Sequence, residues 1–259
     1  MTRAVSAEWA KVRTLPGTGW LLLGVVAVTV AVSAGASAAL SCTSSAACHP
    51  DIIQLSLTGT DVGQAVVAVI AVLAVTGEYA TGMIRATLAA VPRRTVMLTA
   101  KAIVVTALAL PAGALAALGS LLAGRLILPG QGYTPAHGYP DLSLADPTVL
   151  RATAGTVLYL ALIALLSLGI AAATRDAATA IGTVLGLLYL FPVLGLAVTS
   201  PGWHRHLQQI APMSAGLEIQ ASTGLSTVPI SPWAGLGVLA AWAAAALLAG
   251  GLLLRFRDA

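Results

Sequence analysis

Residues 152–173 have the sequence ATAGTVLYLALIALLSLGIAAA, an apolar stretch without a single charged side chain. About 20 apolar residues in a helix are enough to cross the hydrocarbon core of a bilayer. Within that core every backbone N–H and C=O group must find its partner in the protein, so a single spanning segment adopts an α-helix. The stretch therefore predicts a transmembrane helix.

Five further stretches of similar length and composition occur along the chain. The six predicted spans are 18–40, 57–77, 102–124, 152–173, 177–199 and 233–254. The 259 residues are 58% hydrophobic and 8% charged, whereas about a quarter of the residues of a soluble domain are charged. Water is thereby excluded as the solvent for most of the surface. We predict one all-α membrane domain over residues 1–259, surrounded by a lipid bilayer.

The basic residues lie mostly in alternate gaps between the spans. With the N-terminus in the cytoplasm, three of the 13 Lys and Arg residues fall outside, at Arg125, Arg151 and Arg205. Because cytoplasmic segments of membrane proteins are enriched in Lys and Arg, we expect both termini in the cytoplasm. The net charge of +4 is spread over these segments and gives no indication of nucleic-acid binding.

The segment before the first span, residues 1–16, has the pattern of an interfacial helix. Val5, Trp9 and Val12 recur at the spacing of one helix face, and the basic residues of the segment lie off this face. Pro16, followed by a glycine, ends the helix before the membrane. We expect an amphipathic helix at the inner membrane surface. The alternative is a basic flank that only sets the topology.

Lysine is rare in this chain. Lys11 and Lys101 are the only two lysines among the 13 basic residues, an excess of arginine that is associated with GC-rich genomes. Glu8 precedes Lys11 by three residues, which is a favourable spacing for an ion pair on a helix.

Both cysteines, Cys42 and Cys48, fall in the first predicted outside loop. Thiols can oxidise and stay oxidised outside the cytoplasm, and the small polar residues between these two permit a turn. We predict a disulfide bond between them, with two free thiols as the alternative. No second Cys or His pair stands nearby at the spacing of a zinc site.

The most informative stretch between spans is 77–94, with the sequence GEYATGMIRATLAAVPRR. It lies in the predicted cytoplasmic gap after the second span. Ile84, Leu88 and Val91 share one face at helical spacing. Pro92 ends this helix, because its ring disfavours helical geometry in the residue before it.

Charged residues of the same stretch lie on the other side of this predicted helix. Glu78 and Arg85, seven residues apart, share the face opposite the apolar one, and Arg93 and Arg94 stand at the negative end of the helix dipole. We predict a short cytoplasmic helix that docks in a groove of a soluble partner. The alternative is a set of interfacial charges that only fixes the topology.

These residues resemble the second cytoplasmic element of ABC-2-type permeases, the membrane subunits of one class of ABC exporters. In that family a Glu ends the second span, a Gly/Thr step and an apolar-basic helix follow, then Pro-Arg, and a Lys enters the third span. The residues at those places are Glu78, Thr81, Gly82, Arg85, Leu88, Pro92, Arg93, Arg94 and Lys101. The order Thr-Gly departs from many members, which have Gly before Thr. The stretch EYATGMIR and the opening EWAKVRT are similar to a subgroup common in high-GC Gram-positive bacteria.

The resemblance implies a multi-pass permease subunit of an ATP-driven exporter in the bacterial cell membrane. Two such subunits, identical or different, would form a dimer, and each would insert a coupling helix into a separate ATP-binding subunit that holds ATP and Mg²⁺. The residues implied in this coupling are Glu78, Thr81, Gly82, Ile84, Arg85, Leu88, Pro92 and Arg93. It also implies that the outside segment 201–232 forms short helices that dip back into the membrane.

Two other classes of function, an enzyme and an ion-driven transporter, make different demands on the sequence. The chain has no P-loop, His-Glu-x-x-His or Gly-x-Ser-x-Gly sequence, so we expect neither an ATPase site nor a catalytic group, nor a bound cofactor. An ion-driven secondary transporter is the alternative, and it requires an ionisable residue near the membrane centre. The candidates lie at predicted span ends: Asp61, Glu78, Arg125 and Arg151. His204 and His206 lack a third ligand for a metal site.

Overall fold

A computed structural model of the chain describes residues 1–14, 16–41, 50–84, 87, 93–134, 138–198 and 200–256. These residues form helices and connecting turns, and no strand occurs among them. Six helices of this described part are long and apolar enough to cross a membrane, which confirms the predicted all-helical class and number of spans. The spanning helices are α2 (Pro16–Ala39), α4 (Thr60–Ala80), α6 (Arg94–Ile127), α7 (Pro147–Thr174), α8 (Ala177–Ala197) and α11 (Pro232–Phe256).

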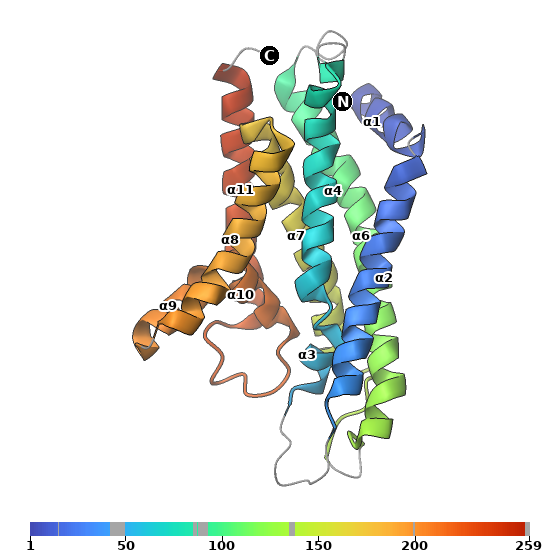
Figure 1. The fold of residues 1–259 in the computed structure, drawn as a ribbon, viewed down its shortest axis with the longest axis vertical. Coiled ribbons are helices and arrows are strands. Elements are labelled where there is room, and N and C mark those ends of the chain that lie inside the picture. Colours follow the sequence, from blue (N-terminus) through green and yellow to red (C-terminus); the bar gives the residue numbers. More distant parts are fainter. Residues whose placement is uncertain are drawn as a thin grey trace.

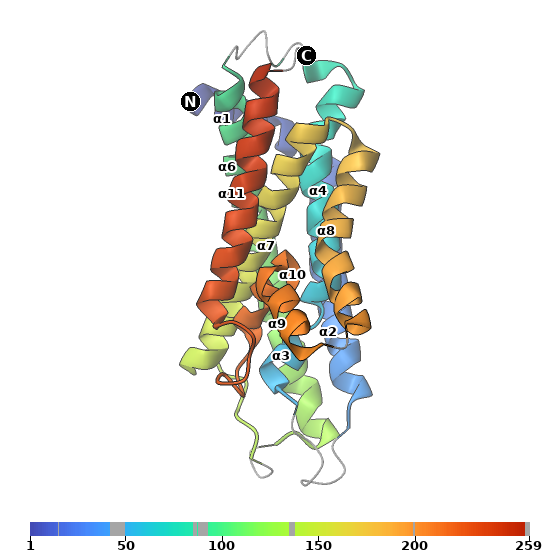
Figure 2. The same ribbon diagram turned by 90° about the vertical axis from the view of Figure 1, so that its left-hand side faces the viewer.

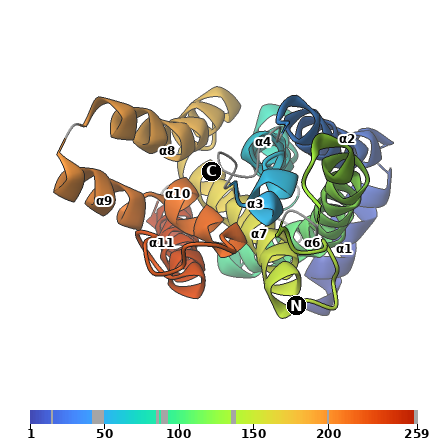
Figure 3. The same ribbon diagram turned by 90° about the horizontal axis from the view of Figure 1, so that it is seen from below.

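Helix α7 is the centre of the bundle. Viewed from below, α2, α4 and α6 lie on one side of it and α8 and α11 on the other (Figure 3). Its side chains Leu160, Ile163 and Leu166 are fully buried. A helix that is apolar on all sides is expected in the interior, and α7 has this character along most of its length.

The ends of the helices differ from the predicted spans at several places. The third span begins at Arg94 instead of residue 102, so that Lys101 lies inside α6. Before α4, the short helix α3 (Ile52–Leu57) extends the second apolar span back to Ile52. Asp61 therefore stands in the first turn of α4 but within the longer apolar span that starts at Ile52, and an ionisable residue inside a span is what an ion-driven transporter requires.

The predicted break between the N-terminal helix and the first span is confirmed. Helix α1 (Thr2–Thr14) ends just before Pro16, which begins α2. Proline is well tolerated at the start of a helix because the first N–H groups have no intrahelical partner. Helix α1 crosses the end of the bundle at a steep angle to the spans (Figure 2).

The long segment after α8 folds back against the bundle. It contains α9 (Pro201–Ile210), α10 (Pro212–Leu217) and the short 3-10 helix η3 (Glu218–Gln220), which lie beside α8 and α11 within the height of the spans (Figure 1). Ile219 is fully buried, and Gln220 Nε2 donates a hydrogen bond to Thr156 Oγ1 of α7 at 3.1 Å. The segment between α8 and α11 therefore contains short helices, as the resemblance implies.

One end of the bundle gathers four chain segments. The N-terminal helix α1, the end of α4, the start of α6 and the end of α11 all lie there (Figure 1). We call this the terminal end. At the opposite end lie the 3-10 helix η1 (Leu128–Gln131) and the first residues of α7. The predicted pair Cys42 and Cys48 lies outside the described residues.

Candidate functional site

Four charged side chains meet at the terminal end, from three helices that are distant in the sequence. Lys101 Nζ of α6 lies 2.6 Å from Glu78 Oε1 of α4 and 2.8 Å from Glu8 Oε2 of α1. Lys11 Nζ of α1 lies 2.7 Å from the same Glu78 oxygen and 2.8 Å from Glu8 Oε1. We call these four residues the ion cluster. It ties α1 to the end of α4 and the first turns of α6.

The ion cluster is largely buried and its charges balance. The side chain of Lys101 is 3% exposed and that of Glu78 is 9% exposed. Lys101 also donates a hydrogen bond to the Ala74 carbonyl at 3.3 Å. Charges taken out of water are tolerated when they are paired and hydrogen-bonded. Two carboxylates and two ammonium groups meet this condition together.

The pKa of the Lys11 ammonium reflects the same surroundings. Burial lowers this pKa, but hydrogen bonds to the carboxylates of Glu78 and Glu8 raise it more, so it lies above the usual value for lysine. A raised pKa in the folded state stabilises the fold fully below the unfolded pKa. That contribution is lost only as the pH rises through the raised value. Lys11 is therefore charged at neutral pH.

Helix α1 turns its charged side toward the bundle. Ala4 and Glu8 are buried, and with Lys11 they follow the i, i+4, i+7 spacing of one face. Trp9, from the predicted apolar stripe, is 40% exposed. The local pair of Glu8 and Lys11 is confirmed. Their burial was not predicted, because periodicity alone does not show which face meets the rest of the protein.

Helix α4 ends shortly after Glu78, at Ala80. Thr81 is the C-cap, and Gly82 follows with a φ of 71°. This left-handed conformation costs glycine little and other residues more. The single helix predicted through Glu78 and Arg85 is thus wrong, because the backbone turns at Gly82 between them.

A pair of substitutions tests this turn. Gly82→Ala should lower the free energy of unfolding by about 1–2 kcal/mol, because an L-residue is strained in the left-handed region. Gly77→Ala should be neutral or stabilising by up to about 1 kcal/mol, since alanine favours a helix interior and a Cβ at Gly77 would meet open space. Both are measured by unfolding in mixed detergent micelles. Equal effects would show that the chain does not turn at Gly82.

The other predicted coupling residues lie in different surroundings. Thr81 and Arg93 are exposed, and Arg93 is the N-cap of α6. Ile84 is 6% exposed and packs in the main hydrophobic core. Thr87 Oγ1 accepts a hydrogen bond from Lys11 Nζ at 3.3 Å. Three more predicted residues lie outside the described part: Arg85, Leu88 and Pro92.

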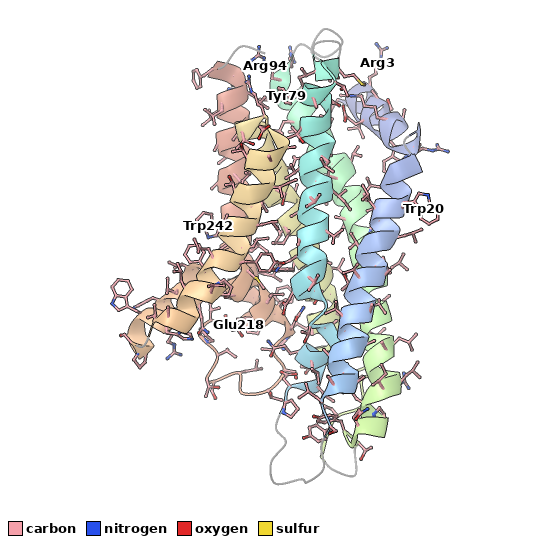
Figure 4. The ribbon with its side chains drawn as sticks, viewed as in Figure 1. Arg3, Trp20, Tyr79, Arg94, Glu218 and Trp242 are labelled. Carbon is pink, nitrogen blue, oxygen red and sulfur yellow. The ribbon has the colours of Figure 1, made fainter. Side chains whose placement is uncertain are left out.

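The last turn of α4 is also linked to the C-terminal helix α11, and Arg175 makes the link. The Arg175 guanidinium, in the turn between α7 and α8, lies 5.7 Å from the centre of the Tyr79 ring. Arg175 also donates to the Leu253 carbonyl, and Arg94 of α6 donates to the Leu254 carbonyl. The last carbonyls of a helix have no intrahelical partner, so these cations stabilise the end of α11. Figure 4 shows Tyr79 and Arg94 close together at the terminal end.

The last turn of α4 is therefore linked in two directions. Glu78 connects it to α1 and α6, and Tyr79 connects it to the α7–α8 turn and, through Arg175, to α11. A displacement of the chain just beyond this turn would reach four other elements. The arrangement suits mechanical coupling and contains no nucleophile–base pair among the residues named here.

Sequence reasoning missed three members of this site. The pairing of Glu8 with Lys11 follows from their spacing, but nothing in the sequence pattern brings this pair, or Lys101, to Glu78. The sequence feature that points to the ion cluster is the rarity of lysine in this chain. Both lysines of the chain belong to the ion cluster, where a compact ammonium group can contact two carboxylates at once.

No metal site is found in the part of the chain that the structure describes, as no group of three His, Cys, Asp or Glu residues could hold an ion. His204 Nδ1 instead lies 3.0 Å from the Gly195 carbonyl oxygen. The contact ties α9 back to the end of α8.

No model of a known protein family matches the chain, and a search of curated proteins finds no match.

Proposed function

We propose that this chain is the permease subunit of an ATP-driven exporter of the ABC-2 type. It acts in the bacterial cell membrane with the terminal end in the cytoplasm, and a dimer of such subunits forms the path for the cargo. ATP and Mg²⁺ bind to a separate soluble ATPase. Six apolar spans and the resemblance in residues 77–94 support this proposal.

The ion cluster is the observation that carries the proposal. Glu78 stands in the last turn of α4, immediately before the segment from Thr81 to Arg93 that would contact the ATPase. Its carboxylate is held by both lysines, from α1 and from α6. When the ATPase closes on ATP, it moves this segment. The ion cluster transmits the movement to α1, α4 and α6 together, and these helices tilt.

The proposed orientation is tested by labelling. In a background with both native cysteines replaced by serine, Met83→Cys should react with a membrane-impermeant maleimide only in inside-out vesicles. Leu126→Cys, near the opposite end of α6, should react only in right-side-out vesicles. Met83 and Leu126 are 48% and 73% exposed, so neither side chain is buried inside the protein. Labelling of position 83 from the exterior would overturn the proposal.

The proposed partner is tested with the P-loop ATPase encoded nearest to this chain. The two proteins should co-purify from detergent, and Arg85→Ala should weaken their association by about 10–100-fold, because a hydrogen bond to a charged group contributes about 1.5–3 kcal/mol. Arg125→Ala is the matched control, since Arg125 is exposed in the last turn of α6, far along the helix from Arg94. Association is measured by titrating the ATPase onto permease in nanodiscs.

Two results would contradict this assignment. One is an ATPase that binds wild type and Arg85→Ala equally. The other is transport by purified permease in vesicles under a pH gradient, without nucleotide. The second result would identify the ion-driven transporter, for which Asp61, inside the second span, would be the first residue to replace.

A further inference from the structure

A cavity of about 490 Å³ lies against the ion cluster. Its walls come from α1, α2, α4 and α6, with Ala164 contributed by α7. Apart from the ion cluster and Thr81, every lining residue is apolar. The volume falls within the range of about 300–1,000 Å³ that is usual for small-molecule sites. The cavity is thus a mainly apolar space with all four charges of the ion cluster along its wall.

Open space reaches the residues next to Glu78. A Cβ added at Gly77 would meet no atom within 4 Å. Gly77 and Ala74, three residues apart on α4, both line the cavity, as residues at this spacing share a helix face. Leu22 of α2 and Leu108 of α6 supply further parts of the apolar wall. An apolar chain therefore has room to lie along α4 as far as the carboxylate.

One oxygen of that carboxylate has no hydrogen-bond partner among the described residues. Glu78 Oε1 accepts from both lysines, at 2.6 and 2.7 Å, whereas Oε2 is buried and accepts no hydrogen bond. The Glu78 side chain is 9% exposed. A buried acceptor without a donor costs about 1–3 kcal/mol. A donor brought by a bound molecule would remove this cost after a small rotation of the carboxylate.

The balance of charge decides which donor fits. The groups that face Glu78 are Glu8, Lys11 and Lys101, so the cluster is already neutral. An ammonium head would add a positive charge without a counter-charge in an apolar space, which is costly. A carboxylate head would face the unpaired oxygen of Glu78 and be repelled. A hydroxyl group donates one hydrogen bond and adds no charge.

We propose that this cavity binds a single-chain amphiphile with a neutral hydroxyl head. The hydroxyl donates to Glu78 Oε2, and the apolar chain lies between α2, α4 and α6. This site requires no nucleotide and no second subunit, and it stands whether or not the chain is part of an ABC exporter.

The experiment uses photoreactive probes with the wild-type chain in phosphatidylcholine nanodiscs, because this lipid head has no N–H or O–H donor. Four probes share a twelve-carbon chain with a diazirine and differ in the head: hydroxyl, methyl ether, ammonium and carboxylate. Peptides of α4 and α6 should be labelled by the alcohol about five- to tenfold more than by the ether, in line with one hydrogen bond. The two charged probes should label these peptides less than the alcohol does.

Variants locate the site. Gly77→Leu and Ala74→Leu fill the cavity while leaving the ion cluster intact, and each should reduce labelling by the alcohol at least fivefold. Gly182→Leu is the matched control, since a Cβ at Gly182 also meets open space but the residue is not part of the cavity lining. Each variant is first shown to unfold at the wild-type temperature. Two positions keep the test valid if one variant does not fold.

Three outcomes would overturn the proposal. Equal labelling by alcohol and ether would show that the head makes no hydrogen bond. Unchanged labelling in the folded cavity variants would place the probe elsewhere. Stronger competition by dioctanoylglycerol than by dodecanol would show that the hydroxyl comes from a two-chain membrane lipid.

Discussion

Lys101→Met should lower the free energy of unfolding by about 3–5 kcal/mol, the largest effect of a single substitution that we expect at the terminal end. The expected loss is large because the charge of Lys101 is buried. The Lys101 ammonium is 3% exposed and contacts both Glu8 and Glu78. Methionine has a similar length and keeps the packing, but it leaves the two carboxylates with a single ammonium between them. Unfolding by SDS in mixed micelles measures the loss.

Lys11→Met is the matched control for this substitution. Lys11 contacts the same two carboxylates, but its side chain is 29% exposed. Water can then solvate the carboxylates in place of the Lys11 ammonium. Exposed ion pairs contribute about 0–1 kcal/mol to the free energy of unfolding. We expect a loss of about 1 kcal/mol. Equal small losses in both variants would show that the ion cluster is accessible to water and does not tie α6 to α4.

A double substitution separates charge from packing. Glu78→Gln with Lys101→Met removes one charge of each sign, so that Glu8 and Lys11 remain as a balanced pair. This double variant should be more stable than Lys101→Met alone, with a coupling energy of about 1–3 kcal/mol, as found for contacting residues in one network. Simple additivity would contradict a charge interaction between Glu78 and Lys101.

The spans could be predicted from the sequence because their signal is local. Each is a run of about 20 apolar residues, and six such helices are found among the residues that the structure describes. The break before Pro16 and the pairing of Glu8 with Lys11 also depend on neighbours in the sequence, and both are confirmed. The helix predicted through Gly82 failed since the apolar periodicity continues across a glycine that turns the backbone.

The ion cluster could not be predicted because its partners are distant in the sequence. Lys101 lies 23 residues from Glu78 and 93 from Glu8. Hydropathy predicts Lys101 outside the third span, since an isolated charge in lipid is costly. Two carboxylates from other helices remove that cost, and α6 extends past Lys101 to Arg94. The start of the third helix therefore differs from the predicted one because the charge of Lys101 is paired inside the bundle.

The contacts at the terminal end also suggest which parts of the bundle move together. Helices α1, α4 and α6 meet in the ion cluster, and the end of α11 is held by arginines from α6 and the α7–α8 turn. A movement that separates α7 from α11 would have to break the contact of Arg175 with the Leu253 carbonyl and the close packing of the two helices. That packing can be tested directly at a glycine.

Gly169→Leu should lower the free energy of unfolding by about 1–3 kcal/mol or more, the range usual for overpacked interiors. A Cβ at Gly169 of α7 would lie 2.5 Å from the carbonyl carbon of Ala246 in α11. This is backbone against backbone, so no side-chain rotation can relieve it. Gly250 of α11 makes the reciprocal approach, with a Cβ 2.5 Å from the Gly169 oxygen. Small residues at such crossings let two spanning helices approach closely, and leucine would force them apart.

Gly182→Leu in α8 controls for the loss of a glycine and the gain of an apolar side chain. A Cβ at Gly182 meets nothing within 4 Å, so leucine there should be neutral or slightly stabilising. Both variants are compared by unfolding in mixed micelles and by the rate of trypsin cleavage after Arg255 of α11. Cleavage should become faster in Gly169→Leu alone, because the end of α11 loosens once it is displaced from α7. If Gly169→Leu were as stable and as resistant to trypsin as Gly182→Leu, the two helices would not cross at this glycine.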